Sequence, residues 1–293
     1  MNSIGPARAG AASPKQGPIA LLCAGGALPF AVADAMRQAG REPLIVGMSG
    51  IADPGLDRLG ARWLALGQLG KLFALLRRER CAGVVLIGAM QRPSLRSMRI
   101  DAVGWSYLFD FLRNIRRGDD AMLRGMLRWF EDQGFPVLGA GEVAPELLAP
   151  EGRLGKAAPA PAMLEAATRG FACLDAISPF DVGQALICVG ERIVAIEGAE
   201  GTDGLIERAG DLVRIGRLKG REALLLKGTK IGQSLKVDLP TIGPRTIERA
   251  AEAGLAGIVV EAGRVLVIEV EAVAAAADAA GLFLVGVKRD RRF

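Results

Sequence analysis

The residues best suited to chemistry are acidic residues and a lysine near the ends of apolar runs in the last third of the chain. Asp238 lies in the stretch 236–244, with the sequence KVDLPTIGP. An acidic residue followed by two prolines and a glycine predicts a fixed turn that presents its carboxylate. Taken alone, Asp238 would most simply cap that turn. A presented carboxylate could also hold Mg²⁺ or act as a general base.

Four more polar residues follow expected strand ends. Glu200, Thr202 and Asp203 come after one strand, and Lys227 ends the next. If these strands run the same way, their carboxyl ends meet at one edge and bring the residues close to Asp238. Asp203 and Asp238 are then candidate Mg²⁺ ligands, and Lys227 could take a phosphate oxygen. Singly, each has a simpler explanation: solvent exposure, a helix N-cap, or a lysine whose head reaches solvent. Their convergence favours an active site.

The composition narrows the chemistry further, because the 293 residues include no histidine. Histidine acid–base catalysis, Ser-His or Cys-His pairs and histidine-ligated zinc are therefore excluded. The four cysteines are scattered without a CxxC pair, which indicates neither a zinc site nor a disulfide framework. Carboxylates, lysine, arginine, hydroxyls or an oxygen-bound metal remain, and oxygen ligands select hard cations such as Mg²⁺.

The charge and hydropathy pattern restricts the partners. The net charge is +5, but there is no nucleic-acid motif and no basic stripe interleaved with aromatic residues. Anionic small molecules or an anionic lipid surface are therefore expected ahead of nucleic acid. No apolar run is long enough to span a bilayer, and residues 1–16 are predicted to form a disordered leader. A homo-oligomer stays an open option.

Residues 17–148 are predicted to form an α/β domain with a mainly parallel, Rossmann-like sheet, because strands and helices alternate along them. The expected strands are 19–23, 44–47, 63–66, 84–87 and 135–138, and the expected helices are 30–38, 69–80, 102–117 and 121–133.

Three features of this domain could contact a ligand. The glycine turn with Gly25 and Gly26 could direct backbone N–H groups at a phosphate, or could be only a tight turn. Arg92 follows a buried strand and could contact an anion, although a surface arginine is the default interpretation. Of Asp119 and Asp120, one can cap the following helix and the other is left for a cation or a hydroxyl.

A proline-rich linker at 149–161 is expected to precede a second domain, 162–293, of mixed α/β type. Two antiparallel hairpins are predicted in it, 183–189 with 192–197 around Gly190, and 257–261 with 264–268 around Ala262 and Gly263. Further strands are expected at 223–227 and 282–287, and helices at 163–174, 205–212, 244–253 and 271–280.

Short motifs along almost the whole chain after the leader resemble those of the non-calcineurin, LpxI-type UDP-2,3-diacylglucosamine pyrophosphatases. They are GGALP (25–29), ADP (52–54), LGQLGK (66–71), RP (92–93), GDDAMLR (118–124), DVGQA (181–185), EGTD (200–203), KVDLPTIGP (236–244) and AGLAGI (253–258). The chain departs from the family pattern at Ala27, where a third glycine is usual, and at Gly141, where a histidine usually precedes Glu-Val.

The resemblance implies a lipid A biosynthetic enzyme with two α/β domains and a substrate cleft between them. It would use Mg²⁺ to hydrolyse UDP-2,3-diacylglucosamine to 2,3-diacylglucosamine 1-phosphate (lipid X) and UMP, in the cytoplasm at the inner-membrane surface. Asp238 matches the family's catalytic aspartate. Glu200, Thr202 and Asp203 would accompany it, and Gln184 and Thr241, within matching motifs, are candidate substrate contacts.

Two other classes of protein stay open on the sequence alone: a nucleotide-binding α/β protein without hydrolytic activity, and an anionic-lipid-binding protein. The first domain by itself would fit the former. A mere nucleotide-binding protein does not need Glu200, Asp203 and Asp238 to converge on one edge of a sheet, so that convergence favours the enzyme. Release of UMP from UDP-2,3-diacylglucosamine would exclude the lipid-binding protein.

Overall fold

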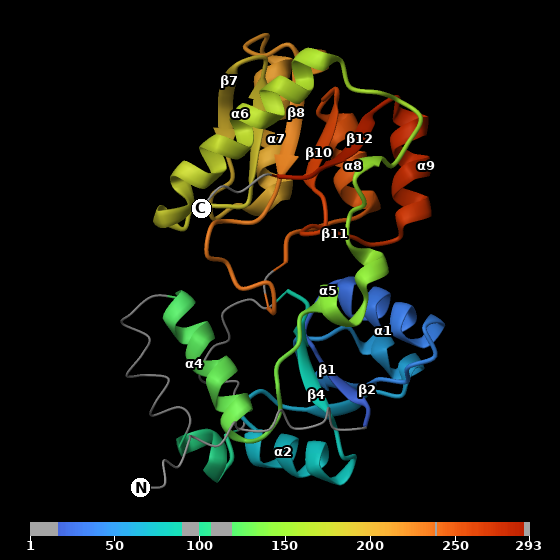
Figure 1. The fold of residues 1–293 in the computed structure, drawn as a ribbon, viewed down its shortest axis with the longest axis vertical. Helices are drawn as coiled ribbons and strands as arrows, with labels where there is room; N and C mark the ends of the chain where they lie inside the picture. The colour runs from blue at the N-terminus through green and yellow to red at the C-terminus, as the bar shows by residue number, and fades with distance from the viewer. Residues whose placement is uncertain (1–16, 90–99, 107–118, 238, 290–293) are drawn as a thin grey trace, which may run out of the picture. The chain divides into compact units, whose positions relative to one another are not determined.

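The computed structural model describes residues 17–89, 100–106, 119–237 and 239–289 (Figure 1). Arg92, Asp238, the predicted leader and most of the helix predicted at 102–117 lie outside this range. The chain divides into two compact units, Met1–Pro29 with Ala39–Leu138, and Phe30–Gln38 with Gly139–Phe293. In the part of the chain that is described, no helix is both long and apolar enough to cross a membrane.

The first unit contains a four-stranded parallel sheet in the order β3-β2-β1-β4. Its strands are β1 (Ile19–Cys23), β2 (Leu44–Met48), β3 (Arg62–Leu64) and β4 (Gly83–Ile87). A parallel bridge between Val84 and Val137 extends pairing beyond β4. The strands are short, apolar and bounded by glycine, as expected for a parallel sheet buried on both faces. The predicted mainly parallel sheet is confirmed.

Helical segments of this unit are η1 (Pro54–Leu59), α2 (Leu69–Arg78) and α4 (Asp119–Asp132), and α1 (Leu28–Gln38) follows the glycine turn after β1. Helix α2 is amphipathic, with Leu72, Phe73 and Leu76 buried. The Phe73 ring centroid lies 4.7 Å from that of Trp129 and 5.5 Å from that of Phe130, both in α4. This aromatic cluster joins α2 to α4 in the core of the unit.

The second unit is built on a six-stranded sheet in the order β5-β12-β10-β8-β6-β7. Strands β8 (Ala223–Lys227), β10 (Gly257–Glu261) and β12 (Phe283–Val287) are parallel to one another. Strand β6 (Ala185–Val189) runs antiparallel to β8 and forms a hairpin with β7 (Arg192–Ile196). This confirms the hairpin predicted around Gly190, whose φ of +53° suits glycine.

Helices cover both faces of this sheet (Figure 1). Buried residues of α7 (Gly201–Arg214), α8 (Pro244–Glu252) and α9 (Val270–Ala280) belong to the same core cluster as Ile187 and Leu225. The cluster on the other face combines α6 (Pro161–Ile177) with Leu186 and Leu226. Neighbouring strand residues therefore contribute to opposite clusters, as the two-residue period of a strand requires.

The second predicted hairpin is wrong. Strand β11 (Leu266–Val267) does not return along β10 but pairs in parallel with β9 (Thr241–Ile242). Strand β10 is already hydrogen-bonded to β8 on one side and β12 on the other, so it has no free edge for a hairpin partner. The pairing instead ties β11 to Thr241 and Ile242 of the DLPTIGP motif, just before α8 begins with Pro244 at its first position.

The segment predicted as a linker also contributes to the sheet. Strand β5 (Gly152–Arg153) pairs antiparallel with β12 and closes that edge. The remaining short segments are α5 (Ala140–Val143), η4 (Pro145–Leu147), η5 (Ser178–Phe180) and η6 (Gly220–Glu222).

Candidate active site

The carboxyl edge of the second sheet gathers polar residues from three strands. Lys227 ends β8 and pairs in register with Ala185 at the start of the antiparallel β6. Because β7 runs back along β6, its end also lies here, and Glu197 follows it directly. The ends of β7 and β8 therefore lie at one edge of this unit, whereas Asp238, which was expected close to them, lies outside the described residues.

A chain of hydrogen bonds links Lys227 to this edge. The Lys227 Nζ donates to Thr202 Oγ1 at 2.7 Å, and the Thr202 hydroxyl donates to Glu197 Oε1 at 2.6 Å. The other Glu197 oxygen accepts the Gln184 N–H at 2.7 Å. Lys227 and Glu197 are each 8% exposed. An ammonium and a carboxylate thus share one hydroxyl at low exposure, which fixes the orientation of all three groups.

Thr202 reaches Lys227 because of the way α7 begins. Gly201, with a φ of +73°, opens the helix directly after Glu200, which is the N-cap residue. Thr202 therefore lies in the first turn, five residues after Glu197. Gly183 and Gly198 make room for the two glutamates, since a Cβ on Gly183 would lie 2.7 Å from Glu197 Cβ and one on Gly198 would lie 2.8 Å from Glu200 Oε2.

Glu200 lies at the exposed rim of the same edge. Its Oε1 accepts from Arg208 Nη2 at 2.8 Å, and that nitrogen also donates to the Ile196 carbonyl at 2.6 Å. Backbone hydrogen bonds at Glu200 itself and at Gly198, with the charge of Arg208, lower the pKa of the Glu200 carboxyl. Glu200 is therefore a carboxylate at neutral pH and does not act as a proton donor there.

Asp203 is held by two arginines of α8. Its Oδ2 lies 2.9 Å from Arg245 Nη2 and 3.5 Å from Arg249 Nε. The ion pairs tie the first turn of α7 to α8, which begins at the end of the DLPTIGP motif. In this arrangement the charge of Asp203 is balanced by the two arginine side chains.

The carboxylates described here do not by themselves make a Mg²⁺ site. Among the described residues, no three acidic or cysteine side chains come together in a way that could hold a metal. Asp203, one of the two predicted ligands, is engaged by Arg245 and Arg249. Enzymes of phosphate chemistry commonly bind Mg²⁺ through one or two carboxylates and the substrate's own phosphate oxygens.

A second polar network, which the sequence did not reveal, lies next to Lys227 on the same edge. The backbone N–H and the hydroxyl of Thr229 both donate to Glu261 Oε2 at 2.8 Å. Arg289 Nη1 donates to the same oxygen at 3.1 Å and to the Thr229 carbonyl at 3.2 Å. Thr229 is fully buried and Glu261 is 1% exposed.

Arg289 also pairs with Asp175, and its guanidinium lies 4.5 Å from the ring centroid of Phe171. The network anchors the start of the segment 228–237, which leads to Asp238. One signal could have found it: Glu261 closes a buried apolar strand with a carboxylate, where a strand end usually carries a turn residue.

The other predicted contacts are placed as follows. Gly25 exchanges two backbone hydrogen bonds with Ala89 in the first unit, N to O at 3.0 Å and 2.8 Å, so its N–H already has a partner. Gly26 follows with a φ of +90°. Thr241 lies in β9 and its hydroxyl donates to the Leu239 carbonyl at 3.2 Å. Asp119 and Asp120 begin α4, and their side chains are outside the description.

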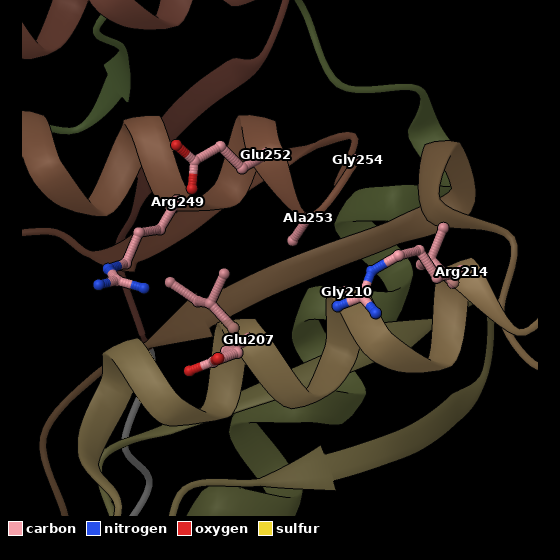
Figure 2. Close-up of a pocket in the computed structure, with 9 residues that line it drawn as sticks. Glu207, Gly210, Arg214, Arg249, Glu252, Ala253 and Gly254 are labelled. Atoms are coloured by element: carbon pink, nitrogen blue, oxygen red, sulfur yellow. The ribbon is translucent and has the colours of Figure 1, made fainter.

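A pocket of about 340 Å³ lies between α7 and α8 (Figure 2). Figure 2 shows Glu207 and Arg214 projecting from α7 and Arg249 and Glu252 from α8. The lining charges are of mixed sign, and none of Lys227, Thr202 and Glu197 lines the pocket. Arg249 connects it to the edge by pairing with Asp203.

Comparison with known proteins assigns both halves of the chain to one family. The family model described as the LpxI N-terminal domain matches residues 18–147, and that of the LpxI C-terminal domain matches residues 150–285. The chain is 43% identical over 277 residues to the UDP-2,3-diacylglucosamine pyrophosphatase LpxI of Caulobacter vibrioides. That match covers 94% of this chain and 99% of the relative. With both family models matched and nearly the full length aligned, the chain belongs to the LpxI family.

Proposed function

We propose that this protein is a Mg²⁺-dependent hydrolase that cleaves the pyrophosphate of UDP-2,3-diacylglucosamine to 2,3-diacylglucosamine 1-phosphate (lipid X) and UMP in lipid A biosynthesis. The observation that carries the proposal is the 43% identity to a pyrophosphatase of that name over 94% of the chain. The polar edge of the second sheet supports it, because a buried lysine beside an oriented hydroxyl suits a ligand with clustered negative charge.

In the proposed reaction, water adds to one phosphorus of the substrate and the bridging oxygen leaves with the other phosphate. The barrier falls when fixed positive charge balances the charge that develops on the phosphate oxygens. Lys227 supplies such a charge at 8% exposure, where little water screens it. Thr202 accepts one Lys227 hydrogen bond and thereby limits the directions open to the ammonium.

Asp238 has the role of orienting the attacking water as general base or of binding Mg²⁺. When bound, the cation would neutralise phosphate charge, held by Asp238 with the substrate's own oxygens. Glu197 is a positioning residue in this scheme, because it holds Thr202 through one oxygen and the Gln184 backbone through the other. Glu261 has the equivalent role for the segment that leads to Asp238.

The substrate carries two acyl chains, so we also propose that the protein works in the cytoplasm at the surface of the inner membrane. Its basic excess, +5 at neutral pH, favours such contact with anionic lipid. Substrate and products are thus a nucleotide lipid, a phosphorylated lipid and UMP.

The test is release of UMP from UDP-2,3-diacylglucosamine by the purified protein, with Mg²⁺ and with excess EDTA. We expect release with Mg²⁺ and its loss in EDTA. Retained activity in EDTA would reject the metal requirement alone, whereas tight substrate binding without UMP release would identify a binding protein.

The variant that tests the proposed role of Asp238 is Asp238→Ala. Removing a base or a metal ligand is expected to lower kcat by about 10³-fold while substrate still binds. Asp211→Ala, which removes a surface carboxylate from α7, is the matched control and should keep the parent rate. A near-normal rate in Asp238→Ala would show that Asp238 takes no part in the chemistry.

A further inference from the structure

An open groove of about 540 Å³ in the first unit runs between the edge strand β3 and helix α2. The α2 residues that line it include Lys71, Leu75 and Arg78, which recur at the spacing of one helical stripe. The opposite stripe, with Leu72, Phe73 and Leu76, is buried in the core. The groove therefore uses the face of α2 that the unit does not need for its own packing.

The lining of this groove is divided into an apolar floor and a cationic rim. Trp63, Leu64 and Leu75 are partly buried and form the floor, whereas Arg62, Lys71 and Arg78 are exposed around it. No acidic residue is among the lining residues. Arg78 pairs with Glu79 at 2.9 Å, while Arg62 and Lys71 make no ion pair within the described part of the chain. Arg62 and Lys71 are thus the rim cations available to an outside anion.

Trp63 is held in a fixed position. Its Nε1 donates to Asp57 Oδ1 at 2.6 Å, and its ring lies against Gly47, where a Cβ would come within 2.6 Å of the ring. The polar end of the indole is therefore satisfied while the ring stays partly exposed in the groove. Tryptophan so arranged is typical of surfaces that meet the headgroup region of a bilayer.

A second set of exposed apolar residues lies in the turn at 101–106, which is attached to the start of α2. Asp101 Oδ2 accepts the N–H groups of Gly70 and Lys71 at 2.8 Å and 3.2 Å, which attaches the helical turn at 102–106 to this end of α2. In that turn Val103 is 39% exposed and Trp105 is 60% exposed. Val103 thus lies beside Gly70 at the start of α2, where a Cβ on the glycine would come within 3.2 Å of it, and Trp105 is exposed in the same turn.

We propose that this face, formed by α2, β3 and the turn at 101–106, is the surface that docks on an anionic bilayer. Phosphates of anionic phospholipids would meet Arg62 and Lys71, and the indoles of Trp63 and Trp105 would enter the headgroup layer. The proposal rests on the proposed function, since a diacylated substrate has to be drawn from a membrane. Each basic residue near such a surface strengthens binding by roughly fivefold, and the effect is screened by salt.

The test is sedimentation of the full-length protein with vesicles of phosphatidylethanolamine and phosphatidylglycerol, and separately with vesicles of phosphatidylcholine. We expect binding to the anionic vesicles that weakens as salt is raised. The double variant Arg62→Gln/Lys71→Gln should bind about 25-fold more weakly. The matched control is Lys219→Gln/Arg221→Gln, which removes two exposed cations from the second unit and should bind like the parent.

A second measurement addresses Trp105. Lipids brominated near the headgroup should quench part of the tryptophan fluorescence of the parent, and Trp105→Phe should lose a share of that quenching. Equal binding to both vesicle types, or equal weakening in both double variants, would overturn the proposal. UMP release in neutral detergent micelles is measured beside it and should be unchanged in Arg62→Gln/Lys71→Gln. Vesicle binding without UMP release would count against the proposed function only.

Discussion

The carboxyl edges of the two sheets differ in how they are built. In the first unit the ends of β1 and β4 are closed by backbone: Gly25 and Ala89 exchange hydrogen bonds, and Gly88 turns with a φ of +98°. In the second unit the corresponding edge is closed by side chains, with Lys227, Glu197 and Glu261 all at most 8% exposed. Both are ends of parallel strands, yet within the described ranges only the second edge holds buried charge.

The two edges differ in the groups that they could offer to an anion. Backbone turns offer N–H groups, and at Gly25 that group is already used within the unit. Buried side chains offer full charges in a fixed orientation, which is what the chemistry of a pyrophosphate needs. The proposed reaction therefore relies on the second edge, and we expect changes at the first to act on stability.

The largest expected effect is on the stability of the second edge. Arg289, 5% exposed, lies between Glu261 and Asp175, so Arg289→Met would remove the nearer cation from the buried Glu261 carboxylate, which also pairs with Arg264 at 3.7 Å. We expect a loss of about 3–5 kcal/mol in the free energy of unfolding. Hydrogen exchange of the β10 and β12 amides would measure it. Lys219→Met removes a lysine of an exposed pair and should change stability by less than about 0.5 kcal/mol.

A similar loss in both variants would mean that burial does not distinguish the Arg289 network from a surface ion pair. Unchanged stability in Arg289→Met would mean that Arg289 is not needed to balance Glu261, and the contrast with the first unit would then lose its energetic basis.

The next effect is on the rate. Lys227→Met keeps the length of the side chain but removes the charge from the hydrogen-bonded chain with Thr202 and Glu197. We expect kcat for UMP release to fall about 10²–10³-fold, as for loss of one oriented electrostatic contact to a transition state. Lys230→Met is the neighbouring control, since Lys230 pairs with Asp181 outside that chain, and it should lower kcat by less than tenfold. Equal losses would place the essential cation elsewhere.

Most elements of the fold could be predicted from the sequence because their signals are local. Strand β8 has the predicted limits, 223–227, since an apolar run ends at a lysine and a glycine. The pairing of β11 could not be predicted, because the Ala262-Gly263 turn signal is local whereas the two occupied edges of β10 are a property of the whole sheet.

In the candidate site, too, some features follow from local sequence and others depend on the whole fold. The meeting of Thr202 with Lys227 was expected only on the condition that their strands run the same way. The structure meets that condition, because β7 and β8 both run antiparallel to β6. The arginines that hold Asp203 come from α8, some forty residues later, and no spacing rule announces them. Glu197 was missed because a glutamate at the end of a strand is usually solvated, and its burial depends on the hairpin and on α7 together.

A smaller effect is expected at the first edge. A Cβ at Gly88 would lie 2.6 Å from the Gly25 carbonyl oxygen, and the φ of +98° adds backbone strain. Gly88→Ala should cost about 3 kcal/mol of stability, with about 1 kcal/mol from backbone and the rest from the contact. Gly50→Ala is the control for backbone alone, because its φ is +77° and a Cβ there would meet nothing within 4 Å.

Tryptophan fluorescence in urea reads this effect selectively, because Trp63, Trp105 and Trp129 all belong to the first unit. The rate of UMP release at a temperature where Gly88→Ala is still folded should stay within threefold of the parent. A loss of rate comparable with that of Lys227→Met, in a folded protein, would bring the first edge into the chemistry.

The smallest expected effect concerns a feature that both sheets share, a buried cysteine in a strand of each. Burial raises the pKa of Cys23 in β1 to about 12 and that of Cys188 in β6 to about 12. The unfolded thiols ionise near their ordinary pKa of roughly 8.5, so above that pH the folded chain binds more protons than the unfolded chain. Stability from each thiol is therefore complete below pH ~8.5 and is lost as the pH rises toward 12.

Each buried thiol should contribute a decline of about 1 kcal/mol per pH unit above pH 9. Cys23→Ala should flatten the decline measured by tryptophan fluorescence in the first unit, and Cys188→Ala the decline measured by hydrogen exchange in the second. If only Cys23→Ala has an effect, water reaches the interior behind the charged edge but not the one behind the backbone turns. The interior of the second sheet would then be more hydrated than that of the first. The difference between the two units would therefore extend from the edges of their sheets to their cores.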